Sequence, residues 1–164
     1  MFVDMYNMPI VLTRIDWPGD FITRKTIAIL EDNDRRIAAM RLALAQATAD
    51  YSVVIYEKAA DMISWLRENM AEVALLSLDY DLPVMRTPDG QVIDYGTGGE
   101  VAEFVAKQPP AFPIIIHSSN PVGVVQMEQH LNRQGWPTTR VYPEDDLAWI
   151  AGVWIFDVRE SLRK

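Results

Sequence analysis

The sequence predicts an α/β domain built on a parallel β-sheet, and three observations carry that prediction. Short apolar runs without polar-apolar alternation recur along the chain, as is typical of strands buried on both faces of a sheet. Stretches with apolar residues at spacings of three and four, typical of amphipathic helices, separate these runs. Carboxylate or hydroxyl side chains follow several runs, where open α/β sheets bind ligands. Strands and helices that alternate in this way, five of each, imply right-handed crossovers.

The chain has 164 residues, which suffices for one domain with a sizeable core and is too short for two. Residues 1–25 show no sustained period and contain a turn signal at Trp17-Pro18-Gly19. We therefore expect residues 1–25 to form an N-terminal extension packed on or beside the domain, as an added strand or hairpin. The domain itself is expected to cover residues 26–164.

The first half of the chain predicts three strands and two helices. Residues 26–30 form the first buried strand, and a helix follows to about Thr48 with Asn33 or Asp34 as its N-cap. A β-rich run at residues 52–56 and an apolar stripe over residues 59–69 predict the second strand and helix.

The third strand, at residues 73–78, ends in the carboxylates of Asp79 and Asp81. Extended geometry sends these two side chains to the same side if the strand persists. The longest irregular stretch, residues 83–99, comes next, and long loops within compact domains are more often functional than idle. This part of the chain is therefore the first place to look for a site.

The second half repeats the alternation. Its expected elements are a helix around residues 101–105, a strand at 114–116, a helix at 124–131, a strand at 138–142 and a last helix that starts at Pro143-Glu144-Asp145-Asp146. Between the fourth strand and its helix lies His117-Ser118-Ser119-Asn120-Pro121, whose hydroxyl, amide and backbone N–H groups suit a phosphate at a helix start. An Asn or Ser N-cap before Pro121 is the alternative, and both can hold together.

The composition limits the possible partners. A formal net charge of −8 argues against a generally basic surface for double-stranded DNA. Without cysteine, a metal must be held by oxygen or imidazole, and disulfides are excluded. No apolar run approaches the roughly 20 residues that a membrane span needs, and the first residues do not resemble a signal peptide. We therefore expect a cytoplasmic protein without a membrane partner.

Two sets of residues are candidates for chemistry. The side chains of Glu31, Asp32, Asp79 and Asp81 converge if the first and third strands are neighbours, which would give an oxygen-only site for Mg²⁺ or Mn²⁺. Helix caps and a solvated acidic rim are the alternative. His117 ends a strand, where an imidazole can act as general acid or base or as a metal ligand, or can be a buried structural histidine.

Two further features have weaker interpretations. Residues 95–100, YGTGGE, suit a phosphate cradle or, more simply, a hinge with Thr97 as N-cap. The pair Trp149 and Trp154 suits a core or a dimer face, so a homodimer is possible.

The order of polar residues along the chain resembles that of response-regulator receiver domains. Glu31 and Asp32 match the acidic metal-binding pair of that family, Asp79 matches its phosphoacceptor aspartate, and Ser118 or Ser119 lies near its switch hydroxyl. The resemblance implies a flavodoxin-like, receiver-like three-layer sandwich whose five-stranded parallel sheet has the order 2-1-3-4-5.

One position departs from ordinary receivers, because Tyr142 stands before Pro143 where they have a lysine. Residues 78–82, LDYDL, together with residues 117–123, HSSNPVG, are similar to motifs of the cyclic-phosphate processing receiver domain family. Arg35 or Arg36 could match the arginine that this family has after the first strand. Tyr80 stands where the family usually has histidine.

This second resemblance implies a divalent-metal-dependent phosphoesterase that processes a cyclic phosphate of a nucleotide or RNA end. The implied roles are metal binding by Glu31, Asp32 and Asp79, catalysis by Asp79, His117 and Asp81, and phosphate binding by Arg35, Ser118, Asn120 and Gly123. The alternative is a non-catalytic or atypical receiver module, with Asp79 as phosphoacceptor, that signals through protein-protein contacts.

Overall fold

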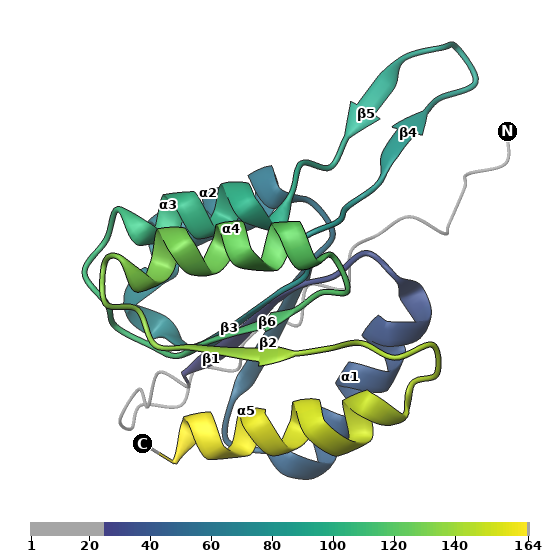
Figure 1. Cartoon of the computed structure of the whole chain (residues 1–164). Helices are drawn as coiled ribbons and strands as arrows, with labels where there is room; N and C mark the ends of the chain where they lie inside the picture. Colours follow the sequence, from purple (N-terminus) through teal and green to yellow (C-terminus); the bar gives the residue numbers. More distant parts are fainter. Residues whose placement is uncertain (1–24, 164) are drawn as a thin grey trace, which may run out of the picture.

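A parallel sheet of five strands forms the centre of the computed structural model, which describes residues 25–163 (Figure 1). In chain order these strands are β1 (Thr26–Leu30), β2 (Ser52–Tyr56), β3 (Val73–Leu78), β6 (Ile114–His117) and β7 (Thr138–Val141). Their order across the sheet is β2-β1-β3-β6-β7, with every neighbouring pair parallel. Counted within the sheet alone, this is the predicted order 2-1-3-4-5.

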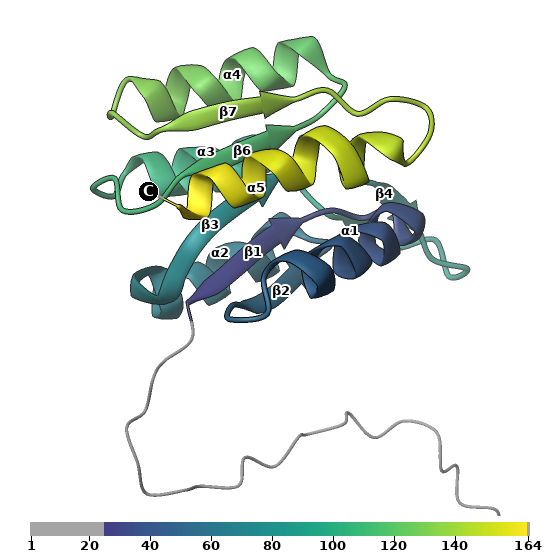
Figure 2. The ribbon, with the colours of Figure 1, turned by 90° about the horizontal axis from the view of Figure 1, so that it is seen from below.

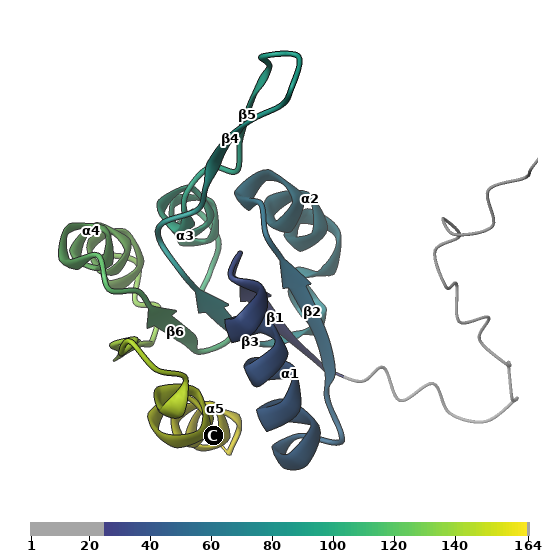
Figure 3. The same ribbon diagram turned by 90° about the vertical axis from the view of Figure 1, so that its right-hand side faces the viewer.

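Helices cover both faces of the sheet, which confirms the three-layer sandwich. They are α1 (Asp34–Ala47), α2 (Ala59–Asn69), the 3₁₀ turn η1 (Met70–Glu72), α3 (Gly98–Ala106), α4 (Pro121–Asn132), the π-helical turn η2 (Ile150–Trp154) and α5 (Ile155–Leu162). The helices α2, α3 and α4 lie on one face, and α1 and α5 lie on the other (Figures 1 and 3). Seen from below, α1 and α5 run side by side across the sheet (Figure 2).

The alternation of side chains along each strand divides the core into two apolar clusters. Leu76 and Leu78 of β3 pack toward α2, α3 and α4, whereas Leu75 packs toward α1 and α5. Since both faces are covered by helices, each central strand is apolar at nearly every position. The single polar residue within β3 is Ser77, which is fully buried on the α1–α5 side.

The stretch 83–99 is not irregular throughout, contrary to the prediction. The strands β4 (Val84–Arg86) and β5 (Val92–Asp94) form an antiparallel hairpin that projects from the domain (Figures 1 and 3). Its turn includes Pro88-Asp89-Gly90, and Gly90 has φ of 86°. A Pro-Asp-Gly sequence between two apolar pairs is a recognised turn signal, so the hairpin could have been predicted.

The last helix also begins later than predicted. Residues 142–147 form a loop, and helical structure starts at Ala148, whose amide donates to the Asp146 carboxylate at 2.8 Å. Three acidic residues in succession after Pro143 are therefore used as loop and cap rather than as a first helical turn. The helix then opens with the π-helical turn η2.

The predicted N-terminal extension, residues 1–25, lies outside the described residues except for Lys25. Within residues 25–163 no helix combines the length and the apolar character that crossing a bilayer requires.

Candidate metal and phosphate site

Three polar residues form a row across the carboxyl edge of the sheet. Glu31 directly follows β1, Asp79 directly follows β3, and His117 is the last residue of β6. The parallel register of the preceding pairs brings the three positions level with one another. By the period of two, these positions share the α1–α5 side with Ser77. The sequence predicted this meeting of distant segments, and the parallel register accounts for it.

Three carboxylates come together at this row. One oxygen each from Glu31, Asp32 and Asp79 lies within 4.8 Å of the others. Glu31 has no exposed surface, and its Oε1 accepts hydrogen bonds from the backbone amides of Asp32 at 3.1 Å and Asn33 at 3.0 Å. Its Oε2 has no hydrogen-bond partner among the described residues. A buried oxygen without a donor, in an all-oxygen cluster, fits a hard cation such as Mg²⁺ or Mn²⁺.

Arg36 is the arginine that the fold brings to this cluster. Its Nη1 lies 3.6 Å from Glu31 Oε2 and 3.5 Å from Asp79 Oδ2. Its guanidinium also lies 5.7 Å from the centre of the Trp149 ring. Arg35 is exposed beside it, and the structure shows its side chain only in the wall of the neighbouring cavity. Of the two alternatives left by the sequence, Arg36 therefore contacts the carboxylates.

His117 is fully buried and lies within a chain of polar contacts. Its Nε2 is 3.4 Å from Glu31 Oε2, and its Nδ1 is 2.8 Å from Ser77 Oγ. Ser77 Oγ in turn accepts a hydrogen bond from Trp154 Nε1 at 3.0 Å. Because an indole nitrogen only donates, Ser77 Oγ accepts from Trp154 and joins it to the imidazole of His117.

The π-helical turn η2 holds Trp154, and Trp149 is the N-cap residue that precedes this turn. Trp149 stacks on His117, with ring centroids 6.1 Å apart and an interplanar angle of 25°. Trp154, five residues later, reaches Ser77. The i to i+5 pairing of a π-helix aligns residues five apart, and such turns are frequent at functional sites. Ser77 and Trp154 were missed as site residues, although a lone serine inside an apolar strand was a usable signal.

The pKa values of the three carboxylates shift in different directions. Burial raises the pKa of Asp79, and the charge of Glu31 adds to this against the lowering effects of His117 and the Ser118 hydroxyl. Burial, together with Glu31 and Asp79, likewise raises the pKa of Asp32.

The pKa of Glu31 is lowered instead. Burial acts to raise it, but the nearby imidazole of His117, the Asn33 amide and the Arg36 guanidinium together outweigh the burial. Glu31 is thus the most firmly ionised member of a cluster whose mutual repulsion a divalent cation would relieve.

Asp81 does not join the three carboxylates, so the predicted convergence of four was wrong. The strand β3 ends at Leu78, and Asp81 instead makes an isolated bridge with Thr97. Its two carboxylate oxygens accept from the Asn120 side-chain amide at 3.0 and 3.1 Å. The condition for both carboxylates to point the same way, a strand that persists, is therefore not met.

The segment after β6 serves chiefly as a helix cap. Asn120 Oδ1 accepts from the Gly123 amide at 2.9 Å, which makes Asn120 the N-cap of α4 with Pro121 in the first turn. The Asn120 side chain and the Gly123 N–H are thus already occupied. Ser118 remains beside the cluster, since it is buried and its hydroxyl acts to lower the pKa of Asp79.

Two glycines allow close packing behind Asp79. A Cβ at Gly98 would lie 1.9 Å from the backbone oxygen of Asp79, and a Cβ at Gly123 would lie 2.2 Å from the Tyr80 ring. The Tyr80 hydroxyl donates to Gln126 at 2.9 Å, so this ring packs toward α4. Hence Gly98 at the start of α3 and Gly123 in α4 allow both helices to approach the segment after β3 closely.

A polar cavity of about 690 Å³ opens next to Arg36. Arg35, Ser119 and Tyr142 contribute to its wall, and the acidic loop at residues 144–146 forms another side. Tyr142 is 70% exposed, at the position where receivers have lysine. The cavity is therefore large enough for a nucleotide-sized ligand and borders the carboxylate cluster through Arg36.

Comparison with known proteins agrees with this geometry. A model of the family described as the cyclic-phosphate processing Receiver domain matches residues 27–133. No curated protein gives a significant match.

Among solved structures, the phosphorylated cyanobacterial phytochrome response regulator RcpA is similar, with 19% identity and a TM-score of 0.63 over 84% of this chain and 92% of that chain. The Mn(2+)-bound form of response regulator Rcp1 has 17% identity and a TM-score of 0.59, over 83% and 90%. The response regulator domain of Thermotoga maritima CheB has 13% identity and a TM-score of 0.60, over 85% and 97%. At these identities the similarity shows a shared receiver fold.

Proposed function

The chain belongs to the cyclic-phosphate processing receiver domain family, and from this premise we propose that it works as an atypical receiver module. In this proposal Glu31, Asp32 and Asp79 hold Mg²⁺ or Mn²⁺, and Asp79 accepts a phosphoryl group. The observation that carries the proposal is the meeting of these three carboxylates within 4.8 Å, with Arg36 in contact with two of them. Similar structures described as phosphorylated and as Mn(2+)-bound support it.

The chemistry is a direct phosphoryl transfer to Asp79. A carboxylate oxygen attacks the phosphorus of a small phosphodonor, and the bond to the leaving group breaks with its electron pair. Arg36, 3.5 Å from Asp79 Oδ2, offsets the added negative charge in place of the missing lysine. A bound divalent cation supplies Lewis-acid stabilisation of phosphoryl oxygens.

His117 has a positioning role in this proposal. It has no exposed surface, and its Nε2 faces Glu31 rather than the polar cavity. A buried imidazole in this place keeps Glu31 ionised and oriented for the cation. The burial supports this role over direct proton transfer to a substrate.

A phosphate analogue tests the proposal. The protein with Mg²⁺ is incubated with acetyl phosphate or beryllofluoride, and the adduct is measured by intact mass and by ¹⁹F NMR. We expect an adduct on the wild type and none on Asp79→Asn. Glu103→Gln, which changes an exposed carboxylate on α3, is the matched control and should react like the wild type. A wild type that binds Mn²⁺ in calorimetry yet forms no adduct would refute the phosphoacceptor role.

In this proposal the receiver module transmits its signal through contacts with other proteins. Large apolar side chains are exposed on the side of α4, the β7 end and the last helical segment, namely Val122, Val125, Tyr142, Val153 and Phe156. A homodimer that forms on phosphorylation would cover part of this surface. Sedimentation with and without the beryllofluoride adduct measures it, and an unchanged mass would limit the output to other partners.

A metal-dependent phosphoesterase for a cyclic phosphate of a nucleotide or RNA end is the second candidate. The polar cavity beside Arg36 favours it, since Arg35 and Ser119 would contact a phosphate there. Asp79 would act as nucleophile or metal ligand, Ser118 would orient the phosphate, and His117 would need to become accessible to move a proton.

Hydrolysis of 2′,3′-cyclic nucleotides with Mn²⁺ tests this candidate. We expect release of a nucleoside monophosphate by the wild type, a loss of at least about 100-fold in Asp79→Asn and a weaker loss in Arg35→Gln. Glu103→Gln again serves as control. Absence of turnover over a panel of cyclic nucleotides and RNA ends would remove the phosphoesterase and leave the receiver module.

A further inference from the structure

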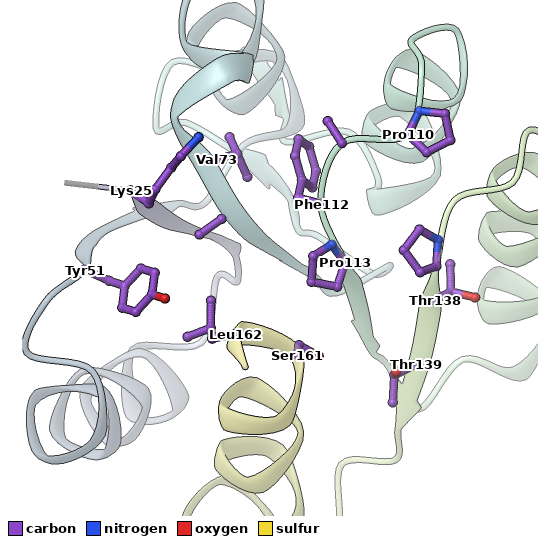
Figure 4. A pocket seen from close by; sticks show the side chains of 13 residues that line it. Lys25, Tyr51, Val73, Pro110, Phe112, Pro113, Thr138, Thr139, Ser161 and Leu162 are labelled. Carbon is purple, nitrogen blue, oxygen red and sulfur yellow. The ribbon is translucent and has the colours of Figure 1, made fainter. Parts of the chain in front are cut away.

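Two cavities lie at opposite edges of the sheet, and their linings differ in polarity. The cavity at the amino edge, of about 590 Å³, has largely apolar walls built from residues such as Val73, Phe112 and Pro113 (Figure 4). The polar cavity at the carboxyl edge, of about 690 Å³, has the side chains of Arg35 and Arg36 in its wall. Two guanidinium groups thus stand at the edge of the sheet where the carboxylates gather.

The side chain of Arg36 reaches from this cavity to the carboxylate cluster. Its Nη1 lies 3.6 Å from Glu31 Oε2 and 3.5 Å from Asp79 Oδ2. The other polar neighbour of Glu31 Oε2 is His117 Nε2 at 3.4 Å, whereas the guanidinium is charged at any ordinary pH. Both distances from Nη1 exceed the roughly 2.7–2.9 Å of a strong charge-assisted hydrogen bond. Arg36 therefore neutralises these two carboxylates without being locked onto either.

The ring of Trp149 gives the same guanidinium a second contact. Arg36 Cζ lies 5.7 Å from the ring centre, within the range of a cation–π interaction. Trp149 is almost fully buried and stacks on His117 with its ring, so its position is fixed. A guanidinium that leaves the carboxylate oxygens therefore still has an aromatic ring and the polar cavity beside it.

The two oxygens that Arg36 contacts belong to the residues that suit a divalent cation. Glu31 and Asp79 are both members of the cluster of three carboxylates, and Glu31 Oε2 is the buried oxygen without a hydrogen-bond donor among the described residues. Like charges a few ångströms apart in a partly buried site repel each other strongly. A divalent cation and the Arg36 guanidinium would therefore oppose each other at these oxygens.

We propose that Arg36 competes with the divalent metal for Glu31 and Asp79, and that a phosphoryl group on Asp79 ends the competition by binding the guanidinium itself. Arginine suits this exchange, since its planar fork binds phosphoryl oxygens in pairs. The inference rests on the proposed function and assigns a regulation to the same site: metal binds weakly to the resting module and tightly to the phosphorylated one. Because such coupling is reciprocal, bound metal stabilises the phosphorylated form to the same extent.

Calorimetric titration with Mn²⁺ alone, at fixed pH and an ionic strength of about 0.15 M, tests the competition. We expect Arg36→Gln to bind Mn²⁺ about 10-fold more tightly than the wild type, because the repulsion is removed. Arg36→Met, which keeps the aliphatic stem, should show the same gain, so the result does not depend on one replacement. Arg36→Lys keeps the charge and should stay within about threefold of the wild type.

Arg35→Gln is the matched control. It removes the same formal charge from the neighbouring residue, whose side chain lines the cavity, and its Mn²⁺ affinity should stay within about twofold of the wild type. Affinities of Arg36→Gln and Arg36→Met that equal the wild type or fall below it would overturn the proposal. An equal gain in Arg35→Gln would overturn it as well, since the effect would then come from net charge alone.

Beryllofluoride tests the coupling to the phosphoryl group. Once the adduct has formed, the difference in Mn²⁺ affinity between the wild type and Arg36→Gln should shrink to below about threefold, because Arg36 then contacts the adduct. An undiminished difference would overturn the coupling. A gain by Arg36→Gln in a protein that forms no adduct would refute the phosphoacceptor role, and the coupling with it, but not the competition. An adduct on the wild type without any gain in Arg36→Gln would do the reverse.

Discussion

The two faces of the sheet are buried to a similar degree but are built from different chemistry. On the α2–α3–α4 side, β3 contributes Leu76 and Leu78 to a continuous apolar cluster. On the α1–α5 side, the same strand contributes Ser77 and leads into Asp79, next to Glu31. Burying polar groups has a free-energy cost unless each finds a partner. The polar groups of the site are gathered on one face and near one edge, so the α1–α5 layer combines an apolar cluster with the candidate site, whereas the other layer is apolar.

The partners on the polar face explain how that face is tolerated. Ser77 links His117 to Trp154, and Arg36 neutralises part of the charge of Glu31 and Asp79. The two atoms of the row left without a hydrogen bond, Glu31 Oε2 and His117 Nε2, face each other at 3.4 Å. On the α2–α3–α4 face, the free energy of unfolding should therefore fall most when a substitution removes side-chain volume. On the α1–α5 face, it should fall when a substitution removes a hydrogen-bond partner.

Leu76→Ala should have the largest effect, because it opens a cavity on the apolar face. Leu76 is fully buried among core residues of α2, α3 and α4. We expect the free energy of unfolding to fall by about 2–5 kcal/mol. Urea denaturation followed by circular dichroism measures it. A loss below about 1 kcal/mol would contradict the close packing of Leu76 within the cluster on this face.

Ser77→Ala, at the next residue, tests the opposite face. It removes few atoms but leaves the Trp154 indole nitrogen and His117 Nδ1 without their shared partner. We expect a loss of about 1–3 kcal/mol. In Ser77→Ala/Trp154→Phe the two losses should be less than additive, because the donor and its acceptor are removed together. Strict additivity would show that the polar chain is not coupled.

Much of the fold was predictable because it depends on local patterns. The buried runs predicted all five strands of the central sheet, and Ala59–Asn69 was predicted to the residue as a helix. The hairpin β4–β5 was missed because its strands have three residues each and pack on nothing that creates a period. The late start of the last helix was missed because an acidic run after Pro143 suits both a first helical turn and a loop.

The parts of the site that lie at strand ends could be predicted from the sequence. The contacts made by side chains from the helices that cover the sheet could not. Glu31, Asp32 and Asp79 meet because parallel register fixes the ends of β1 and β3. Asp81 was misplaced because nothing in its own sequence says that β3 stops at Leu78. The contact from Trp154 depends on a π-helical turn, which no periodicity of 3.6 predicts.

Loss of the charge of Asp79 and loss of the charge of Glu31 should change the free energy of unfolding in opposite directions. Since the pKa of Asp79 is raised in the fold, its ionisation costs stability as the pH rises above its ordinary value of 3.8. The lowered pKa of Glu31 has the reverse effect: it stabilises the fold above the ordinary value of 4.5, and this stabilisation is lost as the pH falls. The opposed signs partly cancel in the wild type.

Without divalent metal, Asp79→Asn should therefore be more stable than the wild type at pH 7, and Glu31→Gln should be less stable. The difference for Asp79→Asn should shrink toward pH 3, where the wild-type side chain is protonated in both states. Urea titrations between pH 3 and 8 in the presence of EDTA measure both variants. If both substitutions changed the free energy of unfolding in the same direction at pH 7, the opposite pKa shifts of the two carboxylates would be contradicted.

Tyr80→Phe should have the smallest effect, since it removes a hydroxyl from the rim of the apolar face. The Tyr80 hydroxyl donates to exposed Gln126 at 2.9 Å, and water can replace that bond when it is lost. The ring keeps its contact with Gly123, where a Cβ would lie only 2.2 Å away. We expect a change in the free energy of unfolding of no more than about 1 kcal/mol, below that of Ser77→Ala, which also removes one hydroxyl. If the two variants proved equal under the same urea titration, the polar contacts of the α1–α5 face would have no special weight, because Ser77 Oγ is buried with two partners and the Tyr80 hydroxyl has a single exposed partner.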